Sequence, residues 1–278
     1  DFNDNDDYVS DVALQPDGKI VVVGTTTDSS GNSDFAAVRF NADGTLDTTF
    51  SSAGTGKATF NAGADEIITD LLIDQTGEQI IFAGNRANYG AEAHDVIVAA
   101  VSTTGTPPLE WQHTFDFNEI EHSPSLALRL DGQIFVGINV YTNVQNDIAI
   151  AQIGPDGFVD TSFATDGSRI INFGSNSDDQ IASVAVDPVD GRAYVVGTIE
   201  DNSGRHAGVM RIRDRLDTKL TGRGLATFDL ATNDRGTGVL VRPDGTTLVT
   251  GYTGTTPLSD EDFFVRAIGI DGTPDAGF

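Results

Sequence analysis

A series of evenly spaced glycines constrains this chain more than any other feature. Gly24, Gly84, Gly137, Gly197 and Gly251 each follow a short, mostly apolar segment, and successive members lie 53 to 60 residues apart. A turn that ends in glycine, usually Asp-Gly, stands five to seven residues before each of them. A repeat of this length without a helical period indicates a propeller or an array, because one unit cannot bury its own faces.

A complete copy of the repeat contains four short segments with strand character. In the first copy they are residues 9–14, 20–24, 36–40 and 57–60, which are apolar or alternating and are separated by turn residues. Four antiparallel strands per repeat, a to d, make one propeller blade. We therefore predict an all-β fold, a single five-bladed β-propeller of four-stranded antiparallel blades. The blades are expected at residues 7–64, 65–121, 122–177, 178–233 and 234–278, the last one together with residues 1–6.

The two ends of the chain indicate how such a ring closes. The fifth copy lacks its fourth strand, and Phe2-Asn3 resembles Phe60-Asn61 at the end of the first copy. We predict that the N-terminal strand completes the last blade, which removes a sheet edge that would otherwise pair with another chain. An open solenoid of five units is the alternative. The interrupted repeat and the start at Asp1 favour a domain of a longer polypeptide or a mature product.

The repeat resembles a known family. Residues 13–24 (ALQPDGKIVVVG) and 33–50 (SDFAAVRFNADGTLDTTF) are similar to the delta-sixty repeat of large bacterial exported proteins. The first and third copies match best, the second departs the most, and together the copies cover essentially the whole chain. The resemblance implies a bacterial β-propeller that is extracellular or on the cell surface, often as one module of a larger polypeptide. It implies no catalytic residues.

The formal net charge of −26 narrows the choice of partner. A phosphate backbone needs a basic surface, so nucleic acid is not an expected partner, and anionic membranes are disfavoured for the same reason. No run of 18 apolar residues occurs, so membrane insertion is not expected. Cysteine is absent, which excludes disulfides and thiolate metal sites. The many aspartates suit both a turn-rich fold and a saline extracellular setting.

Blade geometry separates two kinds of connection. The Asp-Gly turns join strands a and b at one edge, and the b–c loops open at the opposite edge. These b–c loops differ in length and content from copy to copy, as binding loops on a repeated scaffold do. We predict that a protein or glycan ligand binds at this edge. The residues predicted to contact it are Asp28, Tyr89, Tyr141, Asp201 and Tyr252.

Two sets of acidic residues recur at the same edge. The first opens strand a and comprises Asp7, Asp65, Glu121, Asp178 and Asp234. The second opens strand c and comprises Asp34, Asp95, Asp147 and Asp262, with His206 in the fourth copy. Carboxylates crowded near a central channel suit Ca²⁺, for which the second set is the candidate. A structural role, in which each acid accepts backbone hydrogen bonds, is favoured because the acids recur once per copy. No other cofactor is expected.

A catalytic function is the competing class. Five-bladed propellers also host glycosidases, whose carboxylates project from the innermost strands, and Asp7, Asp65 and Glu121 are the acids that such a site would use. The single Trp and five Tyr leave few platforms for stacking a sugar, however. We therefore expect a non-catalytic binding module of a secreted or cell-surface protein. The same pattern is compatible with a lectin that has pockets between its blades, and with a purely structural spacer.

Overall fold

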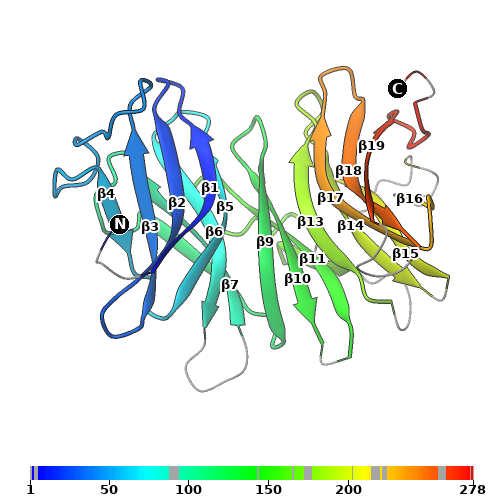
Figure 1. Ribbon diagram of the computed structural model, residues 1–278, viewed down its shortest axis with the longest axis horizontal. Helices are drawn as coiled ribbons and strands as arrows, with labels where there is room; N and C mark the ends of the chain where they lie inside the picture. Colours follow the sequence, from blue (N-terminus) through cyan, green and yellow to red (C-terminus); the bar gives the residue numbers. More distant parts are fainter. Residues whose placement is uncertain are drawn as a thin grey trace. The chain divides into compact units, whose positions relative to one another are not determined.

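The computed structural model describes residues 2, 6–87, 94–142, 144–164, 166–171, 177–201, 203–213, 220, 224–255, 261–275 and 277. All regular secondary structure within these residues is β-strand (Figure 1). The described residues contain no helix with the length and hydropathy needed to cross a membrane. The predicted all-β class is confirmed.

The strands follow one another in antiparallel groups that match the copies of the repeat. The first sheet holds β1 (Asp7–Leu14), β2 (Ile20–Thr27), β3 (Ser33–Phe40) and β4 (Lys57–Phe60). The second holds β5 (Glu66–Ile73), β6 (Gln79–Ala87), β7 (His94–Ser102) and β8 (Trp111–Phe115). The third holds β9 (Ile120–Leu128), β10 (Ile134–Tyr141), β11 (Asn146–Ile153) and β12 (Ser168–Ile171).

The last sheet combines two copies. It contains β13 (Gln180–Val186), β14 (Ala193–Asp201), β15 (Gly204–Ile212) and β16 (Leu225–Phe228), followed by β17 (Asn233–Val241), β18 (Thr247–Gly254) and β19 (Asp262–Ile268). A single parallel pair, Arg205 with Asn233, joins the two copies. The fifth copy therefore has three strands among the described residues, as the sequence predicts.

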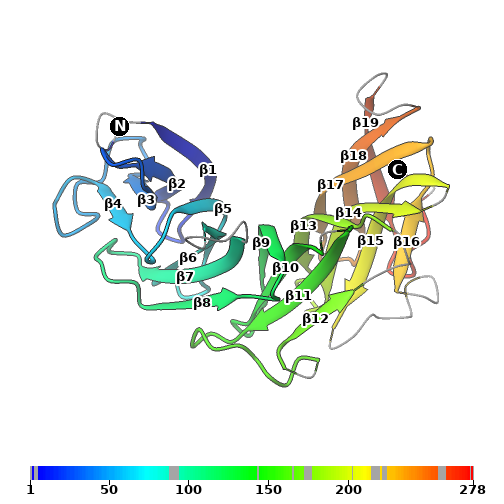
Figure 2. The ribbon, with the colours of Figure 1, turned by 90° about the horizontal axis from the view of Figure 1, so that it is seen from below.

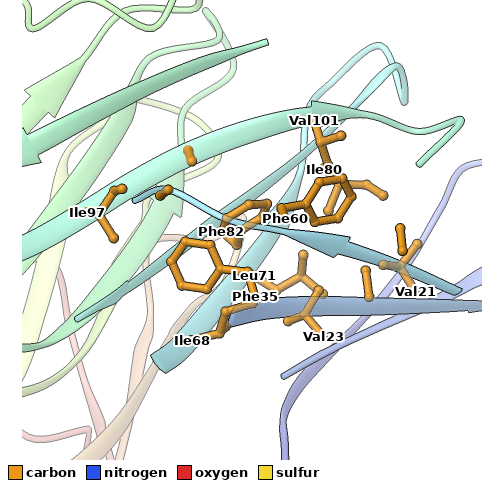
Figure 3. Close-up of a cluster of buried hydrophobic side chains, with 14 of the residues drawn as sticks. Val21, Val23, Phe35, Phe60, Ile68, Leu71, Ile80, Phe82, Ile97 and Val101 are labelled. Carbon is orange, nitrogen blue, oxygen red and sulfur yellow. The ribbon is translucent and has the colours of Figure 1, made fainter. Parts of the chain in front are cut away.

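The chain divides into two compact units. The first comprises residues 1–124 with 156–158, and the second comprises residues 125–155 with 159–278. In the first unit, the sheets β1–β4 and β5–β8 lie side by side in both views (Figures 1 and 2). Their facing side chains form one core, in which Phe35 meets Phe82 edge to face with ring centroids 4.8 Å apart (Figure 3). Neither sheet could bury this face alone, which explains the need for repeated units.

The second unit has two cores of the same kind. Phe135 and Phe163 of the third copy pack with residues of β13–β15, among them Val195. On the other side of the fourth copy, Tyr194 packs with Phe264 of β19. Alternate residues of β14 thus face opposite neighbours, as expected for a strand buried on both sides.

The predicted closing strand falls mainly on residues 1 and 3–5, which lie outside the described residues. Phe2 is described: its N–H donates to the Asp7 carboxylate at 2.9 Å, and the Lys57 ammonium lies 5.5 Å from its ring centroid. Closure of one five-bladed ring and the single-domain organisation stay predictions.

A close backbone contact explains four of the five evenly spaced glycines, here called the marker glycines: Gly24, Gly84, Gly197 and Gly251. The fifth, Gly137, instead faces the side chains of Val184 and Ile181. The register between strands a and b shifts beside these four, for example between Ile68 and Asp70 opposite Gly84. A Cβ placed on Gly84 would lie 2.1 Å from the carbonyl oxygen of Ile67, and one on Gly24 would lie 1.8 Å from that of Tyr8. Because the obstacle is backbone at a bulge, only glycine fits there.

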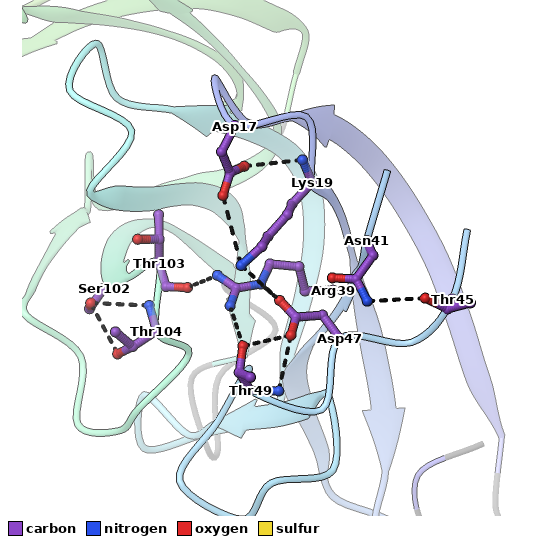
Figure 4. Close-up of polar contacts among 10 residues, drawn as sticks. All are labelled: Asp17, Lys19, Arg39, Asn41, Thr45, Asp47, Thr49, Ser102, Thr103 and Thr104. Atoms are coloured by element: carbon purple, nitrogen blue, oxygen red, sulfur yellow. Dashed lines mark hydrogen bonds and ion pairs between the residues drawn. The ribbon is translucent and has the colours of Figure 1, made fainter. Parts of the chain in front are cut away.

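The connection between strands c and d contains a repeated Asp-x-x-Phe sequence, here called the D-x-x-F element, which is Asp47–Phe50 in the first copy and Asp160–Phe163 in the third. Figure 4 shows the contacts of Asp47. Asp47 is buried, and its carboxylate accepts hydrogen bonds from Arg39 Nε at 2.8 Å and from Thr49 N at 3.0 Å. Lys19 Nζ lies 3.1 Å from the same carboxylate. Burial alone would raise the pKa of Asp47, but the bonds from Thr49 and the two cations hold it well below its usual range. The Arg39 guanidinium also lies 4.9 Å from the centroid of the Phe50 ring.

Candidate functional site

The strand register identifies which acid of each copy occupies the same position. Asp7 pairs with Thr26 and Glu66 with Arg86, each two residues beyond a marker glycine. The counterpart of Asp7 in the second copy is therefore Glu66, and Asp65 lies one residue earlier. In the fourth copy, Gln180 pairs with Thr198, which places Asp179 rather than Asp178 at this position. Where two acids are adjacent, the sequence does not show which of them takes this position, because a shift of the strand register by one residue moves each side chain to the opposite face of the sheet.

The acids at this position hold the turn that leads into strand a. Glu66, Glu121 and Asp234 are fully buried. Glu66 accepts a hydrogen bond from Ala64 N at 2.8 Å, and Glu121 accepts one from Phe117 N at 3.2 Å. Asp234 accepts from the backbone N–H of Leu230 at 2.6 Å. In all three carboxylates, the second oxygen is buried without a hydrogen-bond partner.

The neighbouring acids connect consecutive copies. Asp65 accepts a hydrogen bond from Ser33 N at 3.1 Å, and Asp178 accepts one from Asn146 N at 2.8 Å. In both cases the donor opens strand c of the preceding copy. Asp7, Asp65 and Glu121, the predicted catalytic acids, thus each accept a backbone hydrogen bond from a strand end or loop.

The second set of acids lies beside the residue that follows strand d. Phe35 pairs with Phe60 and Val96 with Phe115, which places Asp34 beside Asn61 and Asp95 beside Asp116. Asp34 accepts a hydrogen bond from Asn61 Nδ2 at 2.7 Å. Burial raises the pKa of Asp34, and the charge of Asp28 adds to the rise.

The remaining predicted metal ligands lie in the second unit. Asp147 is buried and accepts a hydrogen bond from Gln145 Nε2 at 2.8 Å. Asp262 is exposed at the start of β19 and pairs with Thr253. Within the described part of the chain, no cluster of metal-ligating side chains includes Asp34, Asp147 or Asp262.

In the second copy, three acids come together. Asp95, Asp116 and Glu121 each offer a carboxylate oxygen, and the three oxygens lie within 4.8 Å of one another. Burial raises the pKa of Glu121 to about 7, and the charges of Asp95 and Asp116 also raise it. Sequence reasoning placed Asp95 and Glu121 in separate sets and missed Asp116. The phenylalanine before residues 61, 116 and 229 was the available signal, since it fixes the end of strand d.

Glu121 predicts a specific pH dependence of stability. Its pKa is raised in the folded chain from an ordinary value of 4.5 to about 7. Such a group stabilises the fold below its unfolded pKa and loses that contribution as the pH rises through the folded value. In metal-free buffer, we expect the free energy of unfolding to fall by about 3 kcal/mol between about pH 5 and 8 through this group. Urea titrations should show that Glu121→Gln removes this loss; equal losses in both chains would contradict the assignment.

The predicted ligand-binding residues occupy different settings. Asp28 holds its own loop, because it accepts hydrogen bonds from Ser30 N at 2.7 Å and Asn32 N at 3.0 Å. Asp201 does the same with Ser203 N at 2.7 Å. Tyr141 ends β10 and is half-buried, and Tyr252 lies within β18 with 47% of its surface exposed. Tyr89 lies outside the described residues.

A small polar cleft lies in the second unit, where the fourth and fifth copies meet. It has a volume of about 60 Å³ and is lined by Asp178, Gln180, Thr198, Glu200, Arg205 and Arg235. Arg205 Nε donates to Glu200 at 2.6 Å. Arg235 Nε is buried and has no hydrogen-bond partner. The cleft is therefore lined by two guanidinium groups beside carboxylate, amide and hydroxyl groups.

The comparisons with known proteins agree with this architecture. A family model described as a domain of unknown function (DUF5122) beta-propeller matches residues 15–50 and 130–163. The chain has a β-propeller fold. The matched segments run from the a–b turn to the D-x-x-F element in the first and third copies. The finding supports a β-propeller family, and the resemblance to the exported delta-sixty repeat stays a prediction.

Solved structures share the fold at low sequence identity. A protein of unknown function from Dyadobacter fermentans has a TM-score of 0.56 and 13% identity, covering 99% of this chain and 83% of that one. The polysaccharide lyase Uly1 has a TM-score of 0.56 and 9% identity, with coverages of 94% and 70%. An ACO/RPE65 chimera has a TM-score of 0.56 and 10% identity, with coverages of 96% and 60%. Among curated proteins, none matches the chain in sequence.

Proposed function

We propose that this chain is a non-catalytic binding module of a secreted or cell-surface bacterial protein, and that it takes a carbohydrate at the b–c edge of its blades. The observation that carries the proposal is the polar cleft between the fourth and fifth copies. Glu200 and Arg205 of this cleft flank a b–c loop. Sugar hydroxyls both donate and accept, and the cleft offers guanidinium donors next to carboxylate acceptors.

The cleft is too small to enclose a whole sugar, and its size suits contact with part of a glycan at the surface. Its volume of about 60 Å³ is well below the roughly 300–1,000 Å³ of pockets that surround a whole small molecule. It accommodates one edge of a sugar residue, with the rest of the glycan in solvent. The Arg235 guanidinium lines the cleft, and a hydrogen bond from it to a sugar hydroxyl would favour the bound state over the empty cleft.

The carboxylates of the cleft already have structural partners. Asp178 accepts hydrogen bonds from the backbone and side chain of Asn146, and Glu200 pairs with Arg205. Glycoside hydrolysis needs one carboxyl group that donates a proton and a second that attacks or activates water. Acids committed to holding loops serve that chemistry poorly. A glycoside-active enzyme is therefore the alternative to be tested, and binding is the proposed activity.

The proposed location outside the cell is based on the resemblance to the delta-sixty repeat and on the high negative net charge of the chain. A net charge of −26 keeps a chain soluble by self-repulsion and disfavours polyanionic partners. Because acidic glycans would meet this repulsion, we expect neutral sugars to bind best.

A glycan array probed with the full chain tests the proposal. We expect binding to neutral glycans without turnover, and at least a tenfold loss of affinity in Arg235→Met, measured by calorimetry on the best ligand of the array. Arg242→Met is the control, since Arg242 is exposed beside the a–b turn at the other edge and should not affect binding. Absence of any bound glycan, unchanged affinity in Arg235→Met, or cleavage of the bound glycan would each contradict the proposal.

A further inference from the structure

The acidic cluster of the second copy is built differently from its counterparts. We infer that Asp95, Asp116 and Glu121 bind one divalent cation, Ca²⁺ by its ligand chemistry, within the first unit. Asp95 opens β7, Asp116 follows β8, and Glu121 lies in β9. An ion bound here would fasten the end of one copy to the first strand of the next. This site is independent of the proposed glycan cleft.

Glu121 brings a buried oxygen without a hydrogen-bond partner to this cluster, as Glu66 and Asp234 do at their own positions, but only here do two further carboxylates lie beside it among the described residues. Glu121 has no exposed surface, and its Oε1 accepts the hydrogen bond from Phe117 N. Its Oε2 is also buried but has no partner, although its carboxylate belongs to the cluster. A carboxylate oxygen deprived of both water and a donor is costly, whereas a metal ion satisfies it. Asp95 and Asp116 carry the same charge as Glu121 and do not supply the missing donor.

At the junction of the first and second copies, an amide and a guanidinium accompany the acids, although Glu66 Oε2 also lacks a hydrogen-bond partner. The counterpart of Asp116 is Asn61, whose amide donates to Asp34 at 2.7 Å. Burial raises the pKa of Glu66, and the Arg86 guanidinium counteracts the rise. The position after strand d therefore carries an amide donor in the first copy, whereas Asp116 brings a third carboxylate in the second copy.

The fourth copy has an imidazole in place of one carboxylate of the set. Ala207 pairs with Phe228, so His206 corresponds to Asp95 and Asp229 to Asp116. His206 Nδ1 lies 3.8 Å from Asp229, and its Nε2 lies 3.2 Å from Asp201. The imidazole thus replaces one of the three carboxylates, and its Nε2 lies within hydrogen-bond distance of Asp201.

The remaining copies also lack a third acid by sequence. Ile148 pairs with Ile171, so residue 172, which is Asn, takes the position after strand d in the third copy. The N-terminal segment predicted to complete the fifth copy has Asn3 after Phe2. The three positions are the start of strand c, the residue after strand d and the start of the following strand a. In the sequence, only the second copy has an acid at all three, so we expect one site per chain.

The ligand set selects a hard cation. Three carboxylates without nitrogen or sulfur suit Ca²⁺ or Mg²⁺ rather than Zn²⁺ or Cu²⁺. Ca²⁺ holds oxygens at about 2.3–2.6 Å, so two ligands on opposite sides lie about 5 Å apart, against about 4.2 Å for Mg²⁺. The oxygens of the cluster lie within 4.8 Å of one another, which either ion can span; Ca²⁺ is favoured because it tolerates the irregular geometry of three carboxylates from three strands, whereas Mg²⁺ needs a near-ideal octahedron. Water completes the coordination on the side of Asp116, which is exposed.

Thermal unfolding of the full chain with added CaCl₂ or EDTA tests the site. We expect the wild-type Tm to rise by about 5 °C when free Ca²⁺ reaches about 100 times its Kd, and to rise less with MgCl₂. Glu121→Gln should lose the rise and should melt no lower than the wild-type chain in EDTA, because it removes an unpaired buried charge. Asp116→Asn, at an exposed position that tolerates substitution, should lose at least tenfold in Ca²⁺ affinity.

The counterpart in the first copy is the matched control. Glu66→Gln changes the same position of the repeat and should keep the full Ca²⁺ response. An unchanged wild-type Tm in Ca²⁺ would overturn the inference. So would a Ca²⁺ response that survives in both Glu121→Gln and Asp116→Asn.

Discussion

Replacing Asp47 by alanine is expected to lower the free energy of unfolding by about 3 to 5 kcal/mol, because it leaves a buried arginine without its carboxylate. Arg39 is only 6% exposed and donates to Asp47 at 2.8 Å. The substitution also removes the acceptor of Thr49 Oγ1 at 2.6 Å and the ion pair to Lys19. The midpoint of urea unfolding, with the slope of the transition held constant, measures the loss.

Asp160 provides the control for this prediction. It occupies the same position of the D-x-x-F element in the third copy, but it is half-buried and bonds to Ser162 and Gln133 rather than to a buried arginine. Asp160→Ala should cost about 1 to 2 kcal/mol, the value of ordinary hydrogen bonds. If Asp47→Ala and Asp160→Ala lower the free energy of unfolding equally, the ion pair between Arg39 and Asp47 does not contribute to stability beyond the other hydrogen bonds of the D-x-x-F element.

Replacing Gly84 by alanine should have an effect of similar size. The new methyl group would lie 2.1 Å from the Ile67 carbonyl oxygen and 3.0 Å from Ile68 Cα, both of which are backbone. Neither atom moves without disturbing the β5–β6 ladder, so we expect a loss of about 3 kcal/mol or more. The same urea titration measures it.

Gly238 is the matched control for Gly84. It also adjoins a register shift between strands a and b, but a Cβ there meets only Thr250 Oγ1 at 2.8 Å. That hydroxyl ends a side chain that rotates away, so Gly238→Ala should cost less than about 1 kcal/mol. If both alanine variants are equally stable, close backbone approach does not explain the marker glycines.

Much of the fold could be predicted from the repeat, because local patterns decide strands and turns. Residues 20–24 were predicted as strand b of the first copy, and β2 runs from Ile20 to Thr27. The extension beyond Gly24 reflects pairing with β3, which continues to the b–c loop. The pattern of apolar residues does not predict this pairing, because Thr25, Thr26 and Thr27 are polar.

The candidate sites were harder to predict because they depend on register and on contacts between copies. Asp65 and Glu66 are adjacent, and only the pairing of Glu66 with Arg86 shows which of them is buried. Asp116 resembles an ordinary turn residue until the Val96–Phe115 pair places it beside Asp95. Arg235 has no repeat signature, and its role depends on the cleft between copies.

The central claim is that the recurring acids serve the scaffold, except in the second copy, where they bind a cation. Equilibrium dialysis of the full chain against radioactive calcium tests it most directly. We predict one bound Ca²⁺ per chain, none in Glu121→Gln, and at least tenfold weaker binding in Asp116→Asn. Binding of one ion per copy of the repeat would show that the acids form a metal-binding ring, and no binding at all would show that the second copy is no exception; either result would contradict the claim.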